Sequence, residues 1–312
     1  MSKLYDYVVY HKNCVDGFCG LFLLTLTNKI DGNAIIYADV PSADVAPPDI
    51  DGKNVIIIDV AYNKKVVSEY IKKTRKITYI DHHISTREDI TSLKFRKQDE
   101  IIYDVDKCGS SLTWKYFFKD KKLPQFIKYI EDNDTGKWIL KDTTYFMGGL
   151  NVNYPLVYNS ENITRWKKLF NDNEVTNLIK KGKTYSEYQN YLLKHNVGRH
   201  HVTYFPSKIV YNSYKQFFRK IGQYKVVVFN GHGCPSSNLI SNKIFEQIDC
   251  DFIIFWIYNF SKKIYLLQFR SHSVDVSKIA KMFGGGGHTL AAACSIDRDK
   301  YDIYDLFVDN VQ

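Results

Sequence analysis

The sequence lacks the features that mark membrane-spanning proteins, secreted proteins and zinc ribbons. Its longest apolar run, Phe252 to Tyr258, is far shorter than the roughly 20 residues that span a bilayer. The first ten residues contain no basic segment followed by an apolar one, so we expect no signal peptide. The six cysteines never form a C-x-x-C pair, which argues against a zinc ribbon and against a disulfide scaffold. These absences favour a cytoplasmic protein in a reducing compartment, with no membrane partner.

The composition supplies a large folded chain and points to an anionic partner. The 312 residues are 45% hydrophobic and 15% aromatic, enough for one large or two ordinary cores, which excludes a disordered chain. Lys and Arg number 43 against 34 Asp and Glu, and the resulting net charge of +9 attracts nucleotides, nucleic acid or polyphosphate. A solvated basic surface explains the same charge, so charge alone identifies no partner.

The first third of the chain alternates buried runs with amphipathic segments, as α/β domains do. Runs rich in β-branched residues are typical of strands covered on both faces, and they predict a mostly parallel sheet. We expect strands over residues 7–10, 34–37, 55–58 and 77–80, and helices over 17–26 and 64–72. Three of these strands end at a polar residue, namely His11, Asp59 and Asp81. Because ligands of open α/β sheets bind beyond the carboxyl ends of the strands, these side chains should converge on one crevice.

The rest of the chain predicts a helical linker and a second, smaller α/β domain. The apolar spacing is helical over residues 109–130, 159–170 and 174–197, and the last of these helices should join the two domains. Beyond residue 200 we expect a strand over 225–229, a helix over 237–247 and a hairpin of strands 252–258 and 263–270. The predicted domains are therefore 1–195 and 200–312.

The strongest chemical signal is the triplet Asp81-His82-His83, directly after an expected strand. A carboxylate beside imidazoles can bind or orient a divalent metal, although an isolated triplet is equally explained as a surface turn. Further acids, Asp132 and Asp134, follow an expected helix, where each could also serve as a helix cap or turn residue. Crowded carboxylates raise one another's pKa unless a cation shares them, and oxygen and imidazole ligands favour Mn or Mg over Zn.

The second signal is a glycine run, Gly284 to Gly287, followed by His288 and by three alanines that we expect to be helical. Glycine in an element interior costs about 0.5 to 1 kcal/mol, so four in a row predict a close approach to a ligand. Their N–H groups at a helix start would cradle a phosphate; a flexible linker is the alternative. Arg270 ends a strand and suits a phosphate, or else a surface ion pair, and His232 is a further candidate that a surface position explains equally.

Together these motifs resemble the DHH phosphoesterase superfamily in its two-domain form, with a DHH and a DHHA1 domain. The resemblance rests on Asp81-His82-His83 with Asp16-Gly17, Asp59 and a later acid, and on the glycine run ending at His288. It implies that two Mn ions, with Mg as the alternative, bind to His11, Asp16, Asp59, His82 and an acid at Asp132 or Asp134. It also implies that His83 donates a proton to the leaving group and that Asp81 orients the histidines. Substrate contacts would come from Arg270, Gly285, Gly286, Gly287 and His288.

One position departs from the family's first motif, because Asn13 or Cys14 stands where a second acid is usual. We therefore expect one ion to bind more weakly than the other. The expected function is Mn-dependent hydrolysis of a short oligonucleotide or small nucleotide phosphoester by metal-activated water. The alternatives are a degenerate member that binds nucleotides or nucleic acid without hydrolysis, and a polyphosphatase. The oligomeric state stays open between a monomer and a homodimer.

Overall fold

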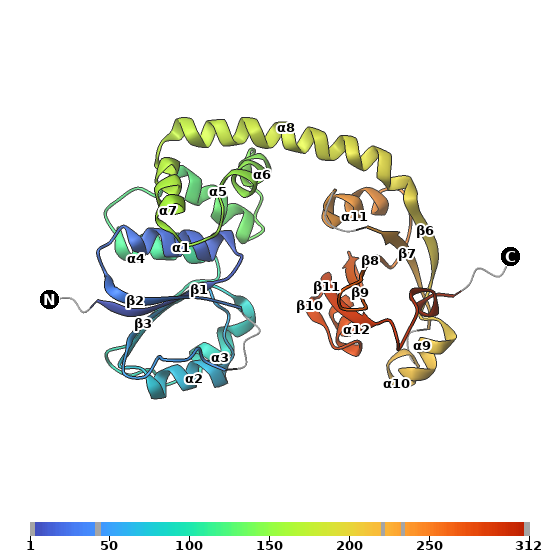
Figure 1. Cartoon of the computed structure of the whole chain (residues 1–312), viewed down its shortest axis with the longest axis horizontal. Coiled ribbons are helices and arrows are strands. Elements are labelled where there is room, and N and C mark those ends of the chain that lie inside the picture. Colours follow the sequence, from blue (N-terminus) through green and yellow to red (C-terminus); the bar gives the residue numbers. More distant parts are fainter. Residues whose placement is uncertain (1–3, 41–44, 220–221, 232–234, 309–312) are drawn as a thin grey trace. The chain divides into compact units, whose positions relative to one another are not determined.

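A computed structural model describes residues 4–40, 45–219, 222–231 and 235–308. The chain divides into two compact units, Met1–Ser186 and Glu187–Gln312 (Figure 1). The division lies within the long helix α8 (Asp172–Asn196).

The first unit is built on a five-stranded parallel sheet in the order β2-β1-β3-β4-β5. The strands are β1 (Tyr5–His11), β2 (Ile30–Asp39), β3 (Asn54–Ile58), β4 (Lys76–Asp81) and β5 (Glu100–Tyr103). The central strand β3 is buried on both faces, with Ile56 and Ile58 in one hydrophobic core and Val55 and Ile57 in another. The predicted parallel α/β sheet is thus confirmed.

Helices cover both faces of this sheet. Figure 1 shows α1 (Val15–Thr25) and α4 (Gly109–Phe117) on one face, and α2 (Lys64–Lys73) and α3 (Arg87–Thr91) on the other. The remaining helices of the unit are α5 (Gln125–Asp134), α6 (Thr143–Asn153) and α7 (Ser160–Lys167), followed by α8. The core on the α1 side includes residues from α5, α6 and α8.

The single helix expected over residues 109–130 is wrong, because the structure has two helices, α4 and α5, in its place. The chain leaves the helical path at Phe118, and Pro124 is the N-cap of α5. Proline cannot donate the backbone hydrogen bond of a helix interior and clashes with the preceding turn, so the two apolar stretches cannot be continuous.

The second unit contains a six-stranded mixed sheet in the order β10-β11-β9-β8-β7-β6. Its strands are β6 (His200–Phe205), β7 (Tyr224–Asn230), β8 (Phe252–Asn259), β9 (Ile264–Ser271), β10 (Gly286–His288) and β11 (Ala291–Asp297). Strands β7 and β8 are parallel, and the other neighbours are antiparallel. One core packs against α12 (Val276–Met282) and the other against α11 (Ser237–Phe245).

The alanine run expected to be helical lies instead in strand β11. Alternate residues of this strand, Ala292, Cys294 and Ile296, are buried, while the residues between them are exposed or partly exposed. This two-residue period outweighs the helix propensity of alanine, because burial against the sheet decides the local structure.

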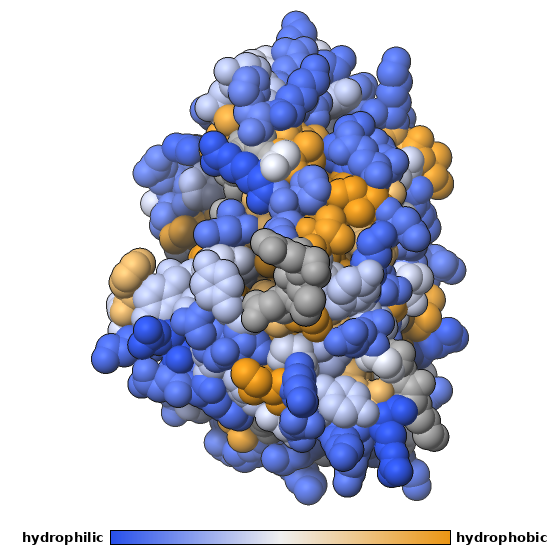
Figure 2. Space-filling view, turned by 90° about the vertical axis from the view of Figure 1, so that its right-hand side faces the viewer, coloured by the Kyte–Doolittle hydropathy of each residue, from blue (hydrophilic) through white to orange (hydrophobic). Residues whose placement is uncertain are grey.

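Within the described ranges, no helix has the length and apolarity needed to cross a membrane. The face turned to the viewer in Figure 2 is largely hydrophilic, with hydrophobic residues in small separate patches. Scattered apolar residues of this kind are normal on a folded surface.

Candidate metal centre

Three neighbouring parallel strands of the first sheet end in the polar residues of the candidate site. His11 is the last residue of β1, Asp81 is the last residue of β4, and Asp59 directly follows β3, which lies between those two strands. Asp59 has a left-handed backbone with φ of 63°, a conformation that short polar side chains tolerate. The predicted convergence of the three side chains at one sheet edge is therefore observed.

Asp59 is the hub of this cluster and is 1% exposed. Its Oδ2 atom lies 3.2 Å from Nδ1 of His11 and accepts a hydrogen bond from the Cys14 thiol at 3.3 Å. Its Oδ1 atom lies 3.2 Å from Nε2 of His82. Burial raises the pKa of Asp59, but the contacts with His11 and His82 outweigh it and hold the pKa below its ordinary value.

His82 faces three carboxylates with a single nitrogen. Its Nε2 lies 3.2 Å from Asp59, 3.1 Å from Asp134 and 3.9 Å from Asp16. Burial lowers the pKa of His82, but the carboxylates of Asp134 and Asp59 outweigh burial and raise the pKa to about 11. Because Nε2 carries at most one hydrogen, the imidazole can donate to only one of these acids at a time.

Asp16, in the first turn of α1, is 1% exposed and approaches the start of α4. Its carboxylate accepts backbone hydrogen bonds from Gly109 at 2.5 Å and Ser110 at 2.9 Å. A Cβ on Gly109 would lie 2.7 Å from Cβ of Asp59 and 2.9 Å from the Asp16 carboxylate, so only glycine fits there. Gly109 and Ser110 were not singled out in the sequence, since nothing local to them signals contact with Asp16.

The carboxylates of this cluster have too little positive charge around them. Burial, together with the neighbouring Asp59 and Asp134, raises the pKa of Asp16 to about 8. Oδ2 of Asp134 is shielded from solvent and faces the shared Nε2 of His82 at 3.1 Å. In the described part of the chain, every ion pair of Asp16, Asp59 and Asp134 is with a histidine.

A divalent cation fits this arrangement. Three sets of residues bring their ligand atoms within 4.8 Å of one another: Asp59, Asp81, His82 and His83; His11, Cys14 and Asp59; and Asp16, His82 and Asp134. A shared cation would neutralise the crowded acids, which otherwise compete for the one nitrogen of His82. The donors are mostly carboxylate and imidazole, which suits Mn and Mg, and the thiol of Cys14 adds one softer donor.

Asp81 and His83 form a distinct pair beside these ligand sets. Oδ1 of Asp81 lies 2.7 Å from Nδ1 of His83, and Oδ2 accepts a hydrogen bond from the Tyr79 hydroxyl at 3.2 Å. Burial lowers the pKa of His83, but the hydrogen bond to Asp81 outweighs it and raises the pKa. The His83 side chain is 27% exposed, against 10% for His82, so His83 is the more accessible of the two.

The structure gives Asp132 and Asp134 different partners, although the sequence could not separate them. Asp132 accepts hydrogen bonds from the Thr143 hydroxyl and from the backbone of Ile139 and Leu140 at 2.8 and 3.1 Å. Burial raises the pKa of Asp132, but these hydrogen bonds outweigh it and lower the pKa. Asp132 therefore anchors the segment after α5, whereas Asp134 points its carboxylate at His82.

The structure also separates Asn13 from Cys14, which the sequence could not do. Asn13 is exposed and has φ of 56°, whereas the Cys14 thiol contacts Asp59 and belongs to the His11 ligand set. Burial raises the pKa of the Cys14 thiol well above its ordinary value. Cys14 is therefore the residue that occupies the neighbourhood of the expected second acid.

In the second unit, Arg270 is part of strand β9, and its side chain contacts the first residues of α11. Its Nε donates to Oδ1 of Asn238 at 2.7 Å, and its Nη2 donates to Oγ of Ser237 at 3.1 Å. Burial lowers the pKa of Arg270. None of the ion pairs of the described residues involves Arg270, so its charge is available to an anion.

The glycine run does not open a helix, as the sequence suggested, but follows the C-terminal end of α12. Gly284, with φ of 76°, donates to the carbonyl of Lys281, and Gly285 donates to that of Ala280. These two hydrogen bonds form the Schellman motif that ends many helices. Two of the four N–H groups expected in a phosphate cradle are therefore already used.

Close packing against β11 explains two members of the run, and Gly286 is left without such a reason. A Cβ on Gly285 would lie 2.2 Å from the carbonyl oxygen of Ala293, and one on Gly287 would lie 2.6 Å from that of Ala291. A Cβ on Gly286 would meet nothing within 4 Å.

Of the other two candidates, His288 is placed only by its backbone. It pairs with Ala291 in the strand register, and Ala291 pairs with Arg270. His232 lies outside the described residues.

The chain matches no known family model. It is 26% identical over 302 residues to uncharacterized protein R106 of Acanthamoeba polyphaga mimivirus; the match covers 92% of this chain but only 66% of that relative's length. Among solved structures it is similar to PggH, a pGpG-specific phosphodiesterase from Vibrio cholerae. The TM-score is 0.50 and the identity 14%, with 95% of this chain and 94% of that chain covered. An exopolyphosphatase-related protein from Bacteroides fragilis matches with a TM-score of 0.46 and 15% identity over 93% of this chain and 86% of that chain.

These likenesses concern the fold. Over nearly its full length the chain has a fold similar to that of PggH, and a His/Asp cluster suited to a metal ion lies at the carboxyl end of its first sheet.

Proposed function

We propose that this protein is a metal-dependent phosphoesterase that hydrolyses a short oligonucleotide or a small nucleotide phosphoester. The observation that carries the proposal is the group of three carboxylates around one imidazole nitrogen, at 3.1, 3.2 and 3.9 Å. Such an arrangement repels itself unless a cation is shared. The fold is also that of a phosphodiesterase, PggH, whose name gives pGpG as its substrate.

In this proposal the chain holds two divalent ions, Mn in the first place, through His11, Asp16, Asp59, His82 and Asp134. A bound divalent ion lowers the pKa of water and neutralises charge on phosphoryl oxygens. Asp81 fixes the ring of His83 through the 2.7 Å contact at Nδ1, which leaves Nε2 to donate a proton to the leaving oxygen. The hydrogen bond to Asp81 raises the pKa of His83 above its ordinary value, which favours the protonated ring.

The second unit supplies substrate contacts in this proposal. Arg270 presents a planar guanidinium that has no acidic partner among the described residues, and a Cβ on Gly286 would meet no atom within 4 Å, which leaves room for a ligand beside it. The net charge of +9 favours an anionic substrate in general. His288 and the two packed glycines, Gly285 and Gly287, stay candidates for contacts through the backbone.

A substrate panel tests the activity. We expect a linear dinucleotide to be hydrolysed with Mn, more slowly with Mg, and not at all after exhaustive chelation; adenosine bisphosphate, a cyclic dinucleotide and polyphosphate complete the panel. Hydrolysis that survives chelation would exclude the metal mechanism. Tight binding of metal and dinucleotide without turnover of any substrate would identify the protein as a non-hydrolysing binder instead.

A matched pair of histidine variants separates ligand from proton donor. His82→Ala should lower bound Mn and abolish turnover, because its Nε2 lies among three acids. His83→Ala should keep the metal and reduce kcat by about 10²- to 10⁴-fold, as loss of a general acid does. If both variants keep the metal content and the rate of the wild type, the triplet is only a structural turn.

A second pair tests the substrate contacts. Arg270→Ala and Gly286→Val should weaken dinucleotide turnover about tenfold to a hundredfold, with much smaller losses on p-nitrophenyl phosphate. Gly287→Ala is the packing control, and it should lower the melting temperature because its Cβ meets β11. Equal losses of Arg270→Ala and Gly286→Val on both substrates would show that the second unit does not read the substrate.

A further inference from the structure

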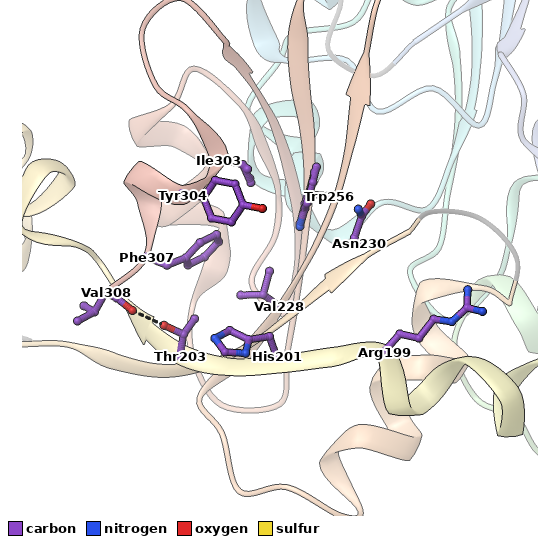
Figure 3. Close-up of a pocket in the computed structure, with 10 residues that line it drawn as sticks. All are labelled: Arg199, His201, Thr203, Val228, Asn230, Trp256, Ile303, Tyr304, Phe307 and Val308. Carbon is purple, nitrogen blue, oxygen red and sulfur yellow. Dashed lines mark hydrogen bonds between the residues drawn. The ribbon is translucent and has the colours of Figure 1, made fainter. Parts of the chain in front are cut away.

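The second unit contains a cavity of about 470 Å³ that none of the proposed catalytic or substrate residues lines (Figure 3). It lies against strands β6, β7 and β8 and against the segment around the 3₁₀-helix η4 (Ile303–Leu306). The lining residues are Arg199, His201, Thr203, Val228, Asn230, Trp256, Ile303, Tyr304, Phe307 and Val308.

The cavity and Arg270 belong to opposite faces of the sheet. Val228 and Trp256 pack with the core that also contains Phe269. Arg270 follows Phe269 in β9, so its side chain points to the other face of the sheet. There it donates hydrogen bonds to Ser237 and Asn238 of α11. A ligand in the cavity would therefore not share the contacts that we assign to Arg270.

The lining combines aromatic rings with the side chains of Arg199 and His201. Trp256 is held edge-on against Tyr265, with ring centroids 5.9 Å apart, and Phe307 is partly buried. Tyr304 lines the cavity and is 77% exposed, so its ring is open to a ligand. Figure 3 shows Tyr304 and Phe307 on one side of the cavity and His201 on β6 on another, with Arg199 beyond it. The ten lining residues include no Asp or Glu.

The polar groups of the lining are few and placed apart. The Thr203 hydroxyl is already used, since it donates to the carbonyl of Val308 at 2.8 Å. Asn230, at the end of β7, is exposed and offers both an amide donor and an amide acceptor. Arg199, in the turn before β6, is exposed and offers a planar cation.

We propose that this cavity binds a nucleotide. The base stacks on the exposed ring of Tyr304, Asn230 hydrogen-bonds to the edge of the base, and Arg199 pairs with the phosphate. A volume of about 470 Å³ falls within the ordinary size of small-molecule pockets. The proposal does not rest on the proposed phosphoesterase function, because it uses neither the metal centre nor Arg270.

Equilibrium dialysis of the full-length protein tests this site. The Arg270→Ala variant in excess EDTA serves as the background, so that the proposed catalytic contacts are weakened and the cavity stays intact. We expect AMP to bind saturably at one site per chain, with adenosine and ribose 5-phosphate each at least about tenfold weaker, because each lacks one of the two recognised groups.

Two variants in the same background locate the binding. Tyr304→Ala and Arg199→Gln should each weaken AMP about tenfold or more, and both should fold, because both side chains are exposed. Tyr204→Ala and Arg298→Gln remove exposed residues of the same types that do not line the cavity, so AMP affinity should not change.

Several results would overturn the proposal. No saturable AMP binding, or equal binding in all four variants, would exclude a nucleotide in this cavity. Ribose 5-phosphate as tight as AMP would show an anion site without base recognition, and adenosine as tight as AMP would show that Arg199 binds no phosphate.

Discussion

The two ends of the first sheet each bury an aspartate, and they neutralise it in opposite ways. At the amino end, the side chain of Asp99 is fully buried and accepts hydrogen bonds from Nε and Nη2 of Arg96 and from the backbone of Ile77, each at 2.9 Å. Burial raises the pKa of Asp99, but Arg96 outweighs it and the pKa is lowered. At the carboxyl end, Asp16 accepts backbone hydrogen bonds and lies 3.9 Å from the shared His82, and burial, together with the neighbouring Asp59 and Asp134, raises its pKa to about 8.

Asp99 and Asp16 are therefore both buried, and they differ in the source of the positive charge near each carboxylate. Asp99 receives its cation from the chain, so it needs nothing from solution. The carboxylates around His82 share one imidazole, and a divalent ion would supply the rest. The comparison indicates that the carboxyl end is built for a ligand and the amino end for stability.

Removing the charge of Asp59 should have the largest effect on function. Asp59 belongs to two of the three ligand sets, so Asp59→Asn should abolish Mn binding and lower phosphoester hydrolysis about a thousandfold or more. Mn titration calorimetry and steady-state kinetics measure the two losses. Unchanged Mn affinity and unchanged rates in this variant would remove the cluster from the mechanism.

Chelation should reveal the strain of the metal-free cluster as a pH dependence of stability. The pKa of Asp16 is raised to about 8, so the folded state binds an extra proton between about pH 4 and 8, and stability falls as pH rises through this range. His82, with a pKa of about 11, adds a loss of the same sign above about pH 6.5.

Thermal melts in EDTA should therefore show a lower melting temperature at pH 9 than at pH 6. Mn at about a hundred times its Kd should add about 2.7 kcal/mol and remove this trend. Melting temperatures in EDTA that stay level or rise from pH 6 to 9 would contradict the account.

Asp99→Asn should weaken the fold and leave the chemistry intact. Loss of charged hydrogen bonds to Arg96 should lower the free energy of unfolding by about 1.5 to 3 kcal/mol, with Mn affinity and kcat unchanged. Since the pKa of Asp99 is lowered, its contribution is present above about pH 4 and is lost as pH falls further. Urea unfolding at pH 7 and pH 3 checks this: the difference from the wild type should shrink at pH 3, and a loss of activity at pH 7 without a loss of stability would contradict the assignment.

Cys14→Asp should have the smallest effect, a gain of about tenfold in Mn affinity, because a carboxylate suits a hard cation better than a neutral thiol. The wild type should show two unequal Mn sites in calorimetry, and the variant should bring them closer. Cys14→Ser is the size-matched control and should give no gain. A fall in affinity in Cys14→Asp would place Cys14 outside the ligand sphere.

The convergence of His11, Asp59 and Asp81 was predictable because it follows from strand polarity alone, and buried runs such as Val55 to Ile58 mark the strands. The sequence could not predict which of Asp132 and Asp134 faces His82. That depends on how the segment after α5 folds back and brings the amides of Ile139 and Leu140 to Asp132. Likewise, the sequence shows four glycines but does not show at which of them a Cβ would clash with β11. Pro124 and the alternation of Ala292, Cys294 and Ile296 are both visible in the sequence, and they outweigh the helical spacing of residues 109–130 and the helix propensity of alanine.

An anomalous difference map from crystals grown with Mn tests the central claim most directly. The account predicts a Mn peak within bonding distance of Asp59, His82 and Asp134, with a second, weaker peak beside His11 and Cys14. Crystals that show Mn elsewhere and none among these side chains would contradict it.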